Sequence, residues 1–339
     1  MTEGTMNKTC DKYGQDECWC DPETEGVNPN CPTHGSGGDP VGQQAGEREA
    51  ASEGKGGCMT VIYRPKGKAL EYAPLAVNLY MGCPHGCRYC YGPLIPNKSK
   101  KGLTMAAWRT RWHSKTVQRP GVLADLSRDC RLMKKRGDTR PVLMCFACDP
   151  YPPDEPEYHV RGYACPQTRA ALRICGEYGV TPIILTKGGT RACRDFDVLK
   201  EAGGWFGQTC AWTSAVDRKR WEPNAAGLQS RITAEQDAHF AGINTWWSIE
   251  PVLDPQQALD CIAQFTGSHF KLGKLSGQDA ETRAIERGIN WPEYLAEARR
   301  ILDDAGYREI AEPGVFEVGT YYVKAELKGC SVGGRGHIA

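Results

Sequence analysis

The chain has 339 residues, 40% of them hydrophobic, and a formal net charge of +1, which suits one barrel-sized domain with a small additional module. It contains no uninterrupted apolar stretch of about 18 residues, so we expect no membrane span. The N-terminal residues have no basic segment followed by an apolar one, so we also expect no secretory signal. The 17 cysteines are odd in number and irregularly spaced, which argues against a secreted disulfide framework and favours a cytoplasmic protein with metal or redox chemistry.

Residues 1–57 differ in composition from the rest of the chain. They are rich in Gly, Ser, Pro and acidic residues, and the Gly-Ser-Gly-Gly run at 35–38 is typical of a linker. We therefore predict a loosely structured acidic arm. Its Cys-Trp-Cys at 18–20 and its Cys-Pro-Thr-His at 31–34 are candidate ligands of a small zinc site. The alternative is an unstructured tail with incidental thiols.

The first predicted strand, over 76–80, leads into a segment with three thiols, Cys83, Cys87 and Cys90, at C-x3-C-x2-C spacing. Three close thiolates can ligate an iron–sulfur cluster and leave its fourth iron without a protein ligand. Such an open position lets a metal centre do chemistry. The Gly and Pro residues between the thiols disfavour a helix and suit a tight loop. The alternative is zinc with a distant fourth ligand, and the spacing favours the cluster.

Residues 97–140 are rich in Lys and Arg. A helix is predicted over 104–116, and Trp108 and Trp112 share one of its faces because they are four residues apart. Basic groups neutralise phosphates and aromatic rings stack on unpaired bases, so this region predicts a nucleic-acid partner. The alternative is a helix whose tryptophans pack inward and whose basic face is solvated.

Strands alternate with helices through the rest of the chain. Further strands are predicted over 141–146, 180–185, 207–213, 245–249 and 269–273, and helices over 167–178, 192–203, 227–240, 256–265 and 291–305. Such alternation implies parallel strands joined by right-handed crossovers. Six units predict an α/β fold of the partial (β/α)6 TIM-like barrel type, with a doubly wound open sheet as the alternative.

Polar side chains follow four of these strands. They are Asp149, Lys187, Ser214 and Glu250. Functional sites in both architectures gather at the carboxyl ends of the strands, where the cysteine segment also lies. Each residue also has a structural interpretation: Asp149 as a turn residue before a proline, Lys187 as a solvated lysine and Ser214 as a local hydrogen-bonding residue. A buried Glu250 would need a partner, because an unpaired buried acid is costly.

The cysteine segment after a first strand, within a six-unit β/α chain, resembles the radical S-adenosylmethionine (SAM) superfamily. Further segments, from about residue 60 to about residue 275, resemble its spore photoproduct lyase-like branch. These segments are Cys148-Asp149-Pro150-Tyr151 with Pro153 and Glu155, Leu185-Thr186-Lys187, the run 194–199, Thr213-Ser214 with Glu222-Pro223 and Arg231, and the run 248–252 with Asp254-Pro255.

The resemblance implies a [4Fe–4S] cluster on Cys83, Cys87 and Cys90. One electron from the cluster would cleave SAM to methionine and a 5′-deoxyadenosyl radical, and a donor such as flavodoxin or ferredoxin would supply that electron. Contacts to SAM are implied for Tyr89 (adenine), Asp149 (ammonium), Lys187 (carboxylate), Ser214 (ribose or carboxylate), Arg231 (carboxylate) and Glu250 (ribose, ammonium or substrate).

The sequence departs from the family pattern after the second strand, where Cys148-Asp149-Pro150 replaces the Gly-Gly-Glu run of many members. Members of the lyase branch use a cysteine as hydrogen donor. Cys145 and Cys148 are candidates by location only, and buried strand thiols are the favoured interpretation. The lyase reaction is therefore not carried over to this chain.

The predicted organisation is an arm over 1–57, a radical SAM core over 58–275 and a C-terminal extension over 276–339. The leading hypothesis is a radical SAM enzyme that acts on a nucleic acid or nucleotide. A non-catalytic zinc-stabilised nucleic-acid-binding protein is the first alternative, and a radical SAM enzyme that acts on a protein partner is the second.

Overall fold

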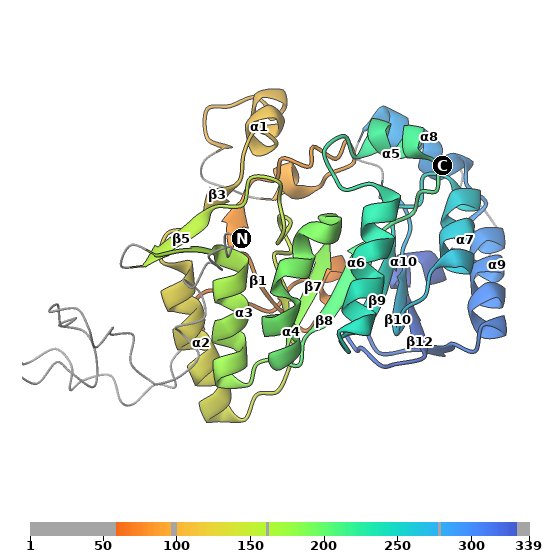
Figure 1. The fold of residues 1–339 in the computed structure, drawn as a ribbon. Coiled ribbons are helices and arrows are strands. Elements are labelled where there is room, and N and C mark those ends of the chain that lie inside the picture. The colour runs from red at the N-terminus through yellow and green to blue at the C-terminus, as the bar shows by residue number, and fades with distance from the viewer. Residues whose placement is uncertain (1–58, 96–99, 161–162, 277–278, 331–339) are drawn as a thin grey trace, which may run out of the picture. The chain divides into compact units, whose positions relative to one another are not determined.

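The computed structural model describes residues 59–95, 100–160, 163–276 and 279–330 (Figure 1). The predicted acidic arm and its candidate zinc ligands lie outside the described residues. The hairpin of β5 (Glu157–Val160) and β6 (Tyr163–Pro166) belongs to a separate unit, and all other described elements belong to one compact unit.

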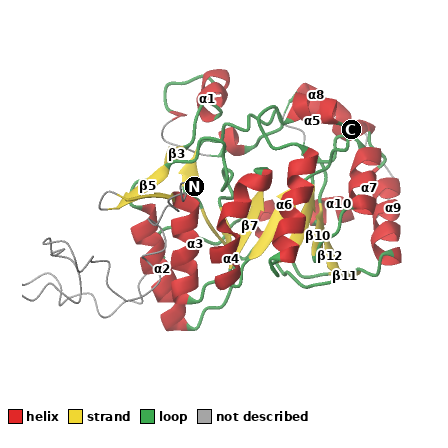
Figure 2. Ribbon diagram, viewed as in Figure 1, coloured by secondary structure: helices red, strands yellow, loops and turns green. Residues whose placement is uncertain are grey.

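An eight-stranded sheet organises this unit (Figure 2). In spatial order its strands are β1 (Leu75–Val77), β4 (Val142–Met144), β7 (Pro182–Thr186), β8 (Trp205–Thr209), β9 (Asn244–Ile249), β10 (His269–Leu272), β12 (Thr320–Val323) and β11 (Arg308–Ile310). All neighbouring pairs are parallel. The first six are the six predicted strands in their predicted order, which confirms the partial barrel. β12 and β11 extend the sheet beyond the prediction.

Helices cover one face of the sheet (Figure 1). The described helices are α1 (Met105–Trp112), α2 (Val122–Arg136), α3 (Gln167–Tyr178), α4 (Phe196–Glu201), α5 (Ala215–Trp221), α6 (Leu228–Phe240), α7 (Pro255–Gln264), α8 (Ala280–Gly288), α9 (Trp291–Asp304) and α10 (Ala325–Lys328). The predictions for α3, α6, α7 and α9 are confirmed. None of the helices in the described ranges has both the length and the apolar character of a membrane span.

The helix that precedes β4 is α2, which the prediction missed. The predicted helix over 104–116 is the shorter α1, and a short strand, β3 (Val117–Gln118), separates it from α2. Val122, Leu126, Cys130 and Met133 of α2 are all buried. Their spacing of three to four residues is the helical signal that the dense basic residues of this segment concealed.

The two faces of the sheet have different contents. On the helical face, Trp247, Phe270 and Tyr321 of neighbouring strands share a hydrophobic core with buried residues of α7 and α9. On the opposite face, Phe316 from the loop between β11 and β12 lies with its ring 5.0 Å from that of Trp246. Because side chains alternate along a strand, consecutive tryptophans of β9 enter these two separate environments.

Candidate active site

The cysteine loop, residues 82–91, follows β1 and the short strand β2 (Tyr80–Met81) at the carboxyl edge of the sheet. Gly82 has a φ of +79°, and a Cβ atom there would lie 2.3 Å from the carbonyl oxygen of Lys115, so only glycine fits. The amide of Cys83 donates a hydrogen bond of 2.9 Å to the carbonyl oxygen of Trp112. The loop is thereby held against the end of α1.

The three thiols of the cysteine loop are free and shielded from solvent to different degrees. Cys87 is buried, whereas Cys83 and Cys90 are half-buried. Burial raises the pKa of Cys87 to about 12, with Glu222 raising it and Lys187 lowering it. Burial is also the largest cause of the raised pKa of Cys83, to which Cys87 and Cys90 contribute as close neighbours. Binding of a metal must therefore displace protons from these thiols.

The donor set of the loop suits an iron–sulfur cluster with one open iron, because three thiolates come from the eight residues 83–90 and the loop, residues 82–91, contains no fourth cysteine. Within the ranges that the structure describes, no three His, Cys, Asp or Glu side chains are already arranged around a point where an ion would sit. The thiols fit the group by their chemistry and by their mutual proximity.

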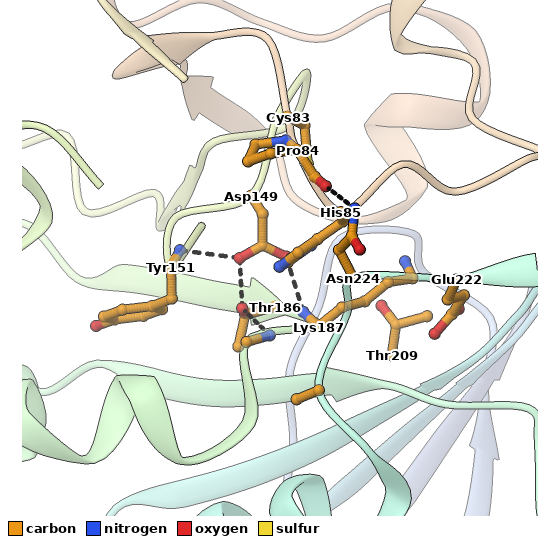
Figure 3. A network of polar contacts seen from close by, with 12 residues as sticks. Cys83, Pro84, His85, Asp149, Tyr151, Thr186, Lys187, Thr209, Glu222 and Asn224 are labelled. Carbon is orange, nitrogen blue, oxygen red and sulfur yellow. Dashed lines mark hydrogen bonds and ion pairs between the residues drawn. The ribbon is translucent and has the colours of Figure 1, made fainter. Parts of the chain in front are cut away.

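Asp149 lies after β4, and its carboxylate accepts three hydrogen bonds and lies beside His85 (Figure 3). Oδ1 accepts from the amide of Tyr151 at 2.8 Å and from the hydroxyl of Thr186 at 2.5 Å. Oδ2 accepts from the amide of Lys187 at 2.8 Å and lies 3.4 Å from Nδ1 of His85. Burial opposes ionisation of Asp149, but His85 and these hydrogen bonds hold its pKa well below its usual range.

Lys187 presents a free cation beside the cysteine loop. Its Nζ lies 5.8 Å from the ring centre of Tyr89, and its ammonium forms no hydrogen bond or ion pair with any described residue. Its charge lowers the pKa of Cys90, although burial raises that pKa more. A half-buried, unpaired ammonium near the thiols of Cys87 and Cys90 is a ready site for an anionic group of a ligand.

Tyr89 is held by a buried ion pair. Its hydroxyl donates to Oε1 of Glu222, whose Oε2 accepts from Nη2 of Arg231. Arg231 is fully buried and also donates to the carbonyl oxygens of Thr209 at 2.5 Å and Ala226 at 3.0 Å. The guanidinium of Arg231 therefore has three protein acceptors, and its direct effect in the site is to fix the ring of Tyr89 through Glu222.

Ser214 is the N-cap residue of α5. Its hydroxyl oxygen accepts from the amide of Asp217 at 3.2 Å, and its own amide donates to Oε1 of Gln257 at 2.8 Å. The hydroxyl proton is not used by these two contacts. Ser214 thus combines the structural role considered for it with a donor that remains free for a ligand.

Glu250 follows β9 and has the partner that its burial required. Both of its carboxylate oxygens accept from Nζ of Lys324, at 2.8 and 2.9 Å. Oε1 also accepts from the hydroxyls of Tyr72 and Ser248. A Cβ atom at Gly273 would lie 2.2 Å from Oε2, so glycine at this position leaves room for the carboxylate.

Cys145 and Cys148 lie in the turn after β4. Cys145 is buried and has a φ of +62°, which is uncommon for a residue other than glycine. The thiol of Cys148 donates to the carbonyl oxygen of Tyr80 at 3.3 Å. Cys145 is thus a buried thiol, as in the favoured interpretation, but it lies just after the strand, and Cys148 is half-buried.

The aromatic residues of the basic region are not on its surface. Trp108 and Trp112 are each only 4% exposed, and their rings contact each other edge to face at 5.7 Å. The indole NH of Trp108 donates to the carbonyl oxygen of Pro93 at 2.9 Å. This matches the alternative of inward-packed tryptophans. Because the two rings are buried, they do not support a nucleic-acid partner through base stacking.

Contacts at the carboxyl edge connect the cysteine loop with Asp149, Lys187 and, through Tyr89, Arg231, whereas Ser214 and Glu250 are held by other partners. Sequence reasoning gave no site role to His85 or Glu222. The position of His85 inside the cysteine motif could have indicated a site role. For Glu222 the corresponding feature was the Glu-Pro pair at 222–223.

Comparison with solved structures identifies the architecture. The structure matches spore photoproduct lyase complexed with dinucleoside spore photoproduct, with a TM-score of 0.51 and 15% identity over 78% of this chain and 79% of that chain. The chain has the spore photoproduct lyase fold. A mutant of that lyase with bound AdoMet and dinucleoside spore photoproduct matches with a TM-score of 0.50, 15% identity and the same coverage of both chains. The predicted resemblance is thus confirmed at the level of the fold.

Proteins related in sequence extend this picture only in part. Uncharacterized proteins of Mycobacterium tuberculosis and Mycobacterium bovis are 27% identical to this chain over 224 residues, or 65% of its length. The match spans 58% of the length of each of these relatives. No family model matches the chain. The evidence for the spore photoproduct lyase fold is therefore structural. The chemistry must be argued from the residues of the site.

Proposed function

We propose that this protein is a radical SAM enzyme whose Cys83, Cys87 and Cys90 hold a [4Fe–4S] cluster. When bound, the cluster would supply one electron for the reductive cleavage of SAM to methionine and a 5′-deoxyadenosyl radical. The observation that carries the proposal is the position of three thiols and an unpaired Lys187 ammonium together at the carboxyl edge of this fold.

The residues around the loop divide into those free to bind SAM and those already engaged. Lys187 is free to pair with the carboxylate of SAM, and the ring of Tyr89, fixed by Glu222, offers an apolar face for the adenine. Asp149 has four protein partners and Glu250 has three. This favours positioning roles over the predicted contacts of Asp149 with the SAM ammonium and of Glu250 with ribose, ammonium or substrate.

A nucleic acid or nucleotide is the proposed substrate class. The support is the dinucleoside bound to the structural neighbour and the excess of Lys and Arg over 97–140. A substrate on a protein partner is the alternative. Reduction of the cluster by a flavodoxin or ferredoxin is part of the same proposal.

Anaerobic reconstitution with iron and sulfide tests the function. We expect a brown protein with about four irons per chain, and dithionite-dependent release of 5′-deoxyadenosine from SAM. Cys87→Ala should lose the cluster. Lys187→Met should keep the iron and raise KM for SAM by about tenfold, as expected for the loss of one charged contact. An intact cluster without 5′-deoxyadenosine, or a colourless protein with stoichiometric zinc, would contradict the proposal.

A further inference from the structure

The side chain of His85 extends from the cysteine loop, between the first two proposed cluster ligands, into the protein. It is only 1% exposed. Its Nε2 lies 2.8 Å from Nη2 of Arg191, and its Nδ1 lies 3.4 Å from Oδ2 of Asp149. Because a guanidinium can only donate, Nε2 must accept, and the ring proton is therefore on Nδ1, directed at the carboxylate. Both ring nitrogens of His85 thus have a partner on another strand-end segment.

The backbone of the same loop is fixed from a different direction. Asn224, in the segment after α5, donates through Nδ2 to the carbonyl oxygen of Pro84 at 2.8 Å. The backbone amide of Asn224 donates to the carbonyl oxygen of His85 at 3.1 Å. At Gly86, φ is +68° and a Cβ atom would lie 3.4 Å from Pro223. The loop is therefore clamped on its backbone by Asn224 of the segment after α5 (Figure 3). Through the imidazole of His85 it is held by Asp149 and Arg191.

The carboxylate of Asp149 connects two parts of the site. One oxygen, Oδ2, meets both the imidazole of His85 and the amide of Lys187. Arg191 completes the arrangement, because its Nε donates to the carbonyl oxygen of Tyr151 at 3.0 Å while Nη2 reaches His85. The cysteine loop and the residue that bears the free ammonium are thus linked by one buried, ionised carboxylate. The segment after α5 is a second link, because the amide of Ala226 donates to the carbonyl oxygen of Lys187 at 2.9 Å.

We infer that His85 and Arg191 are positioning residues, which with Asp149 hold the cysteine loop in register with Lys187 so that one SAM molecule can reach both. The inference rests on the proposed function for its consequence in catalysis. Outer contacts of this kind orient the groups that hold a metal, and their loss typically costs roughly tenfold to a hundredfold in affinity or activity.

The first test needs no cofactor. In the full chain without metal, His85→Leu removes both ring contacts, so we expect hydrogen exchange of the loop amides to be at least roughly tenfold faster, while α9 is unaffected. His85→Asn, which restores a donor toward Asp149, should recover part of the protection. His269→Leu is the matched control, because His269 is equally buried and, among the described residues, its ring has a hydrogen bond only to the hydroxyl of Thr320, at 2.8 Å. Unchanged loop exchange in His85→Leu would overturn the inference.

The second test uses the reconstituted protein. We expect His85→Leu to raise KM for SAM by roughly ten- to a hundredfold with a smaller change in kcat. In a double-mutant cycle with Lys187→Met the two effects should not add, because both remove the same ligand contact. Additive effects, as a purely structural role predicts, would refute positioning. Where His85→Leu does not fold, Arg191→Met gives the same comparison.

The two proposals fail in different ways. If the wild-type protein with an intact cluster does not cleave SAM, the proposed function is wrong, and the exchange experiment still decides whether His85 and Arg191 hold the loop. If SAM is cleaved and the KM of His85→Leu equals that of wild type, the function stands and the positioning inference is wrong.

Discussion

Two buried acids at the carboxyl edge, Asp149 after β4 and Glu250 after β9, have opposite electrostatic environments. Asp149 accepts from two backbone amides and a hydroxyl beside His85, and its pKa is lowered in spite of burial. Glu250 is paired with Lys324, yet burial dominates and its pKa is raised, with Glu326 contributing in the same direction.

The difference lies in the neighbours: His85, followed by the hydrogen bonds of Lys187 and Thr186, outweighs the burial of Asp149, whereas Lys324 does not outweigh the burial of Glu250, beside which Glu326 and Glu71 add negative charge. Backbone amides cannot turn away from Asp149, and four contacts replace its hydration. One ammonium on a flexible side chain does not offset the desolvation of Glu250. The β4–β7 end of the edge is thus built to keep a permanent charge under the cysteine loop, whereas the β9–β12 end is a charge pair that pH can alter.

The largest effect is expected from Asp149→Ala, which leaves two amides and a hydroxyl without their acceptor and should cost about 4 kcal/mol of unfolding free energy in urea titration. Asp129 of α2 is a matched control, because its buried carboxylate accepts at 2.7, 2.8 and 3.0 Å from three successive amides, those of residues 60–62. Asp129→Ala should cost a similar amount. Only Asp149→Ala should also lower iron incorporation. Equal iron incorporation in the two variants would show that Asp149 does not support the cysteine loop.

Lys324→Met is expected to cost about 3 kcal/mol at pH 7, because it leaves Glu250 charged, buried and unpaired. The folded pKa of Glu250 is raised, so the folded protein binds a proton more tightly than the unfolded chain. The lost stability should therefore return as the pH falls through that folded pKa. Urea titrations between pH 5 and pH 8 measure this, and Lys324→Met/Glu250→Gln should lack the pH dependence.

Acid titration of Asp149 should run in the opposite direction. Its folded pKa is lowered, so its contribution to stability is complete above the unfolded value of about 4 and is lost as the pH falls toward the folded pKa. We expect the difference in unfolding free energy between wild type and Asp149→Asn to shrink by about 1 kcal/mol between pH 6 and pH 3, because one group loses at most about 1.4 kcal/mol per pH unit below its unfolded pKa. If the difference in unfolding free energy stays constant over this range, the pKa of Asp149 is not lowered in the folded protein.

The smallest effect is expected at Ser214, which belongs to neither acid's network. Ser214→Ala should cost about 1 kcal/mol as the loss of an N-cap. Thr104 is its matched control, because its hydroxyl oxygen caps α1 by accepting from the amide of Ala107 at 3.2 Å. If the free hydroxyl proton of Ser214 meets SAM, Ser214→Ala alone should raise KM for SAM. Equal kinetics of the two variants would leave Ser214 with the cap only.

The sequence by itself determined the six core strands, most of the helices between them, and the three thiols on a loop too rich in glycine for a helix. These features depend on periodicity and on backbone preferences over a few residues, so they are readable locally. The strands β12 and β11 were not predicted, because short strands show little hydrophobic periodicity. α2 escaped because its basic residues concealed its buried face.

Tertiary structure alone decided which of the predicted polar residues are free. Glu250 meets Lys324 across 74 positions of sequence, and Asp149 meets the amide of Lys187 across 38. Such pairings follow from strand order and register, which bring distant strand ends to one edge, and no local pattern encodes them. Lys187 looked like Asp149 and Glu250 in the sequence. Only the packed structure saturates the two acids and leaves the ammonium open beside the cysteine loop.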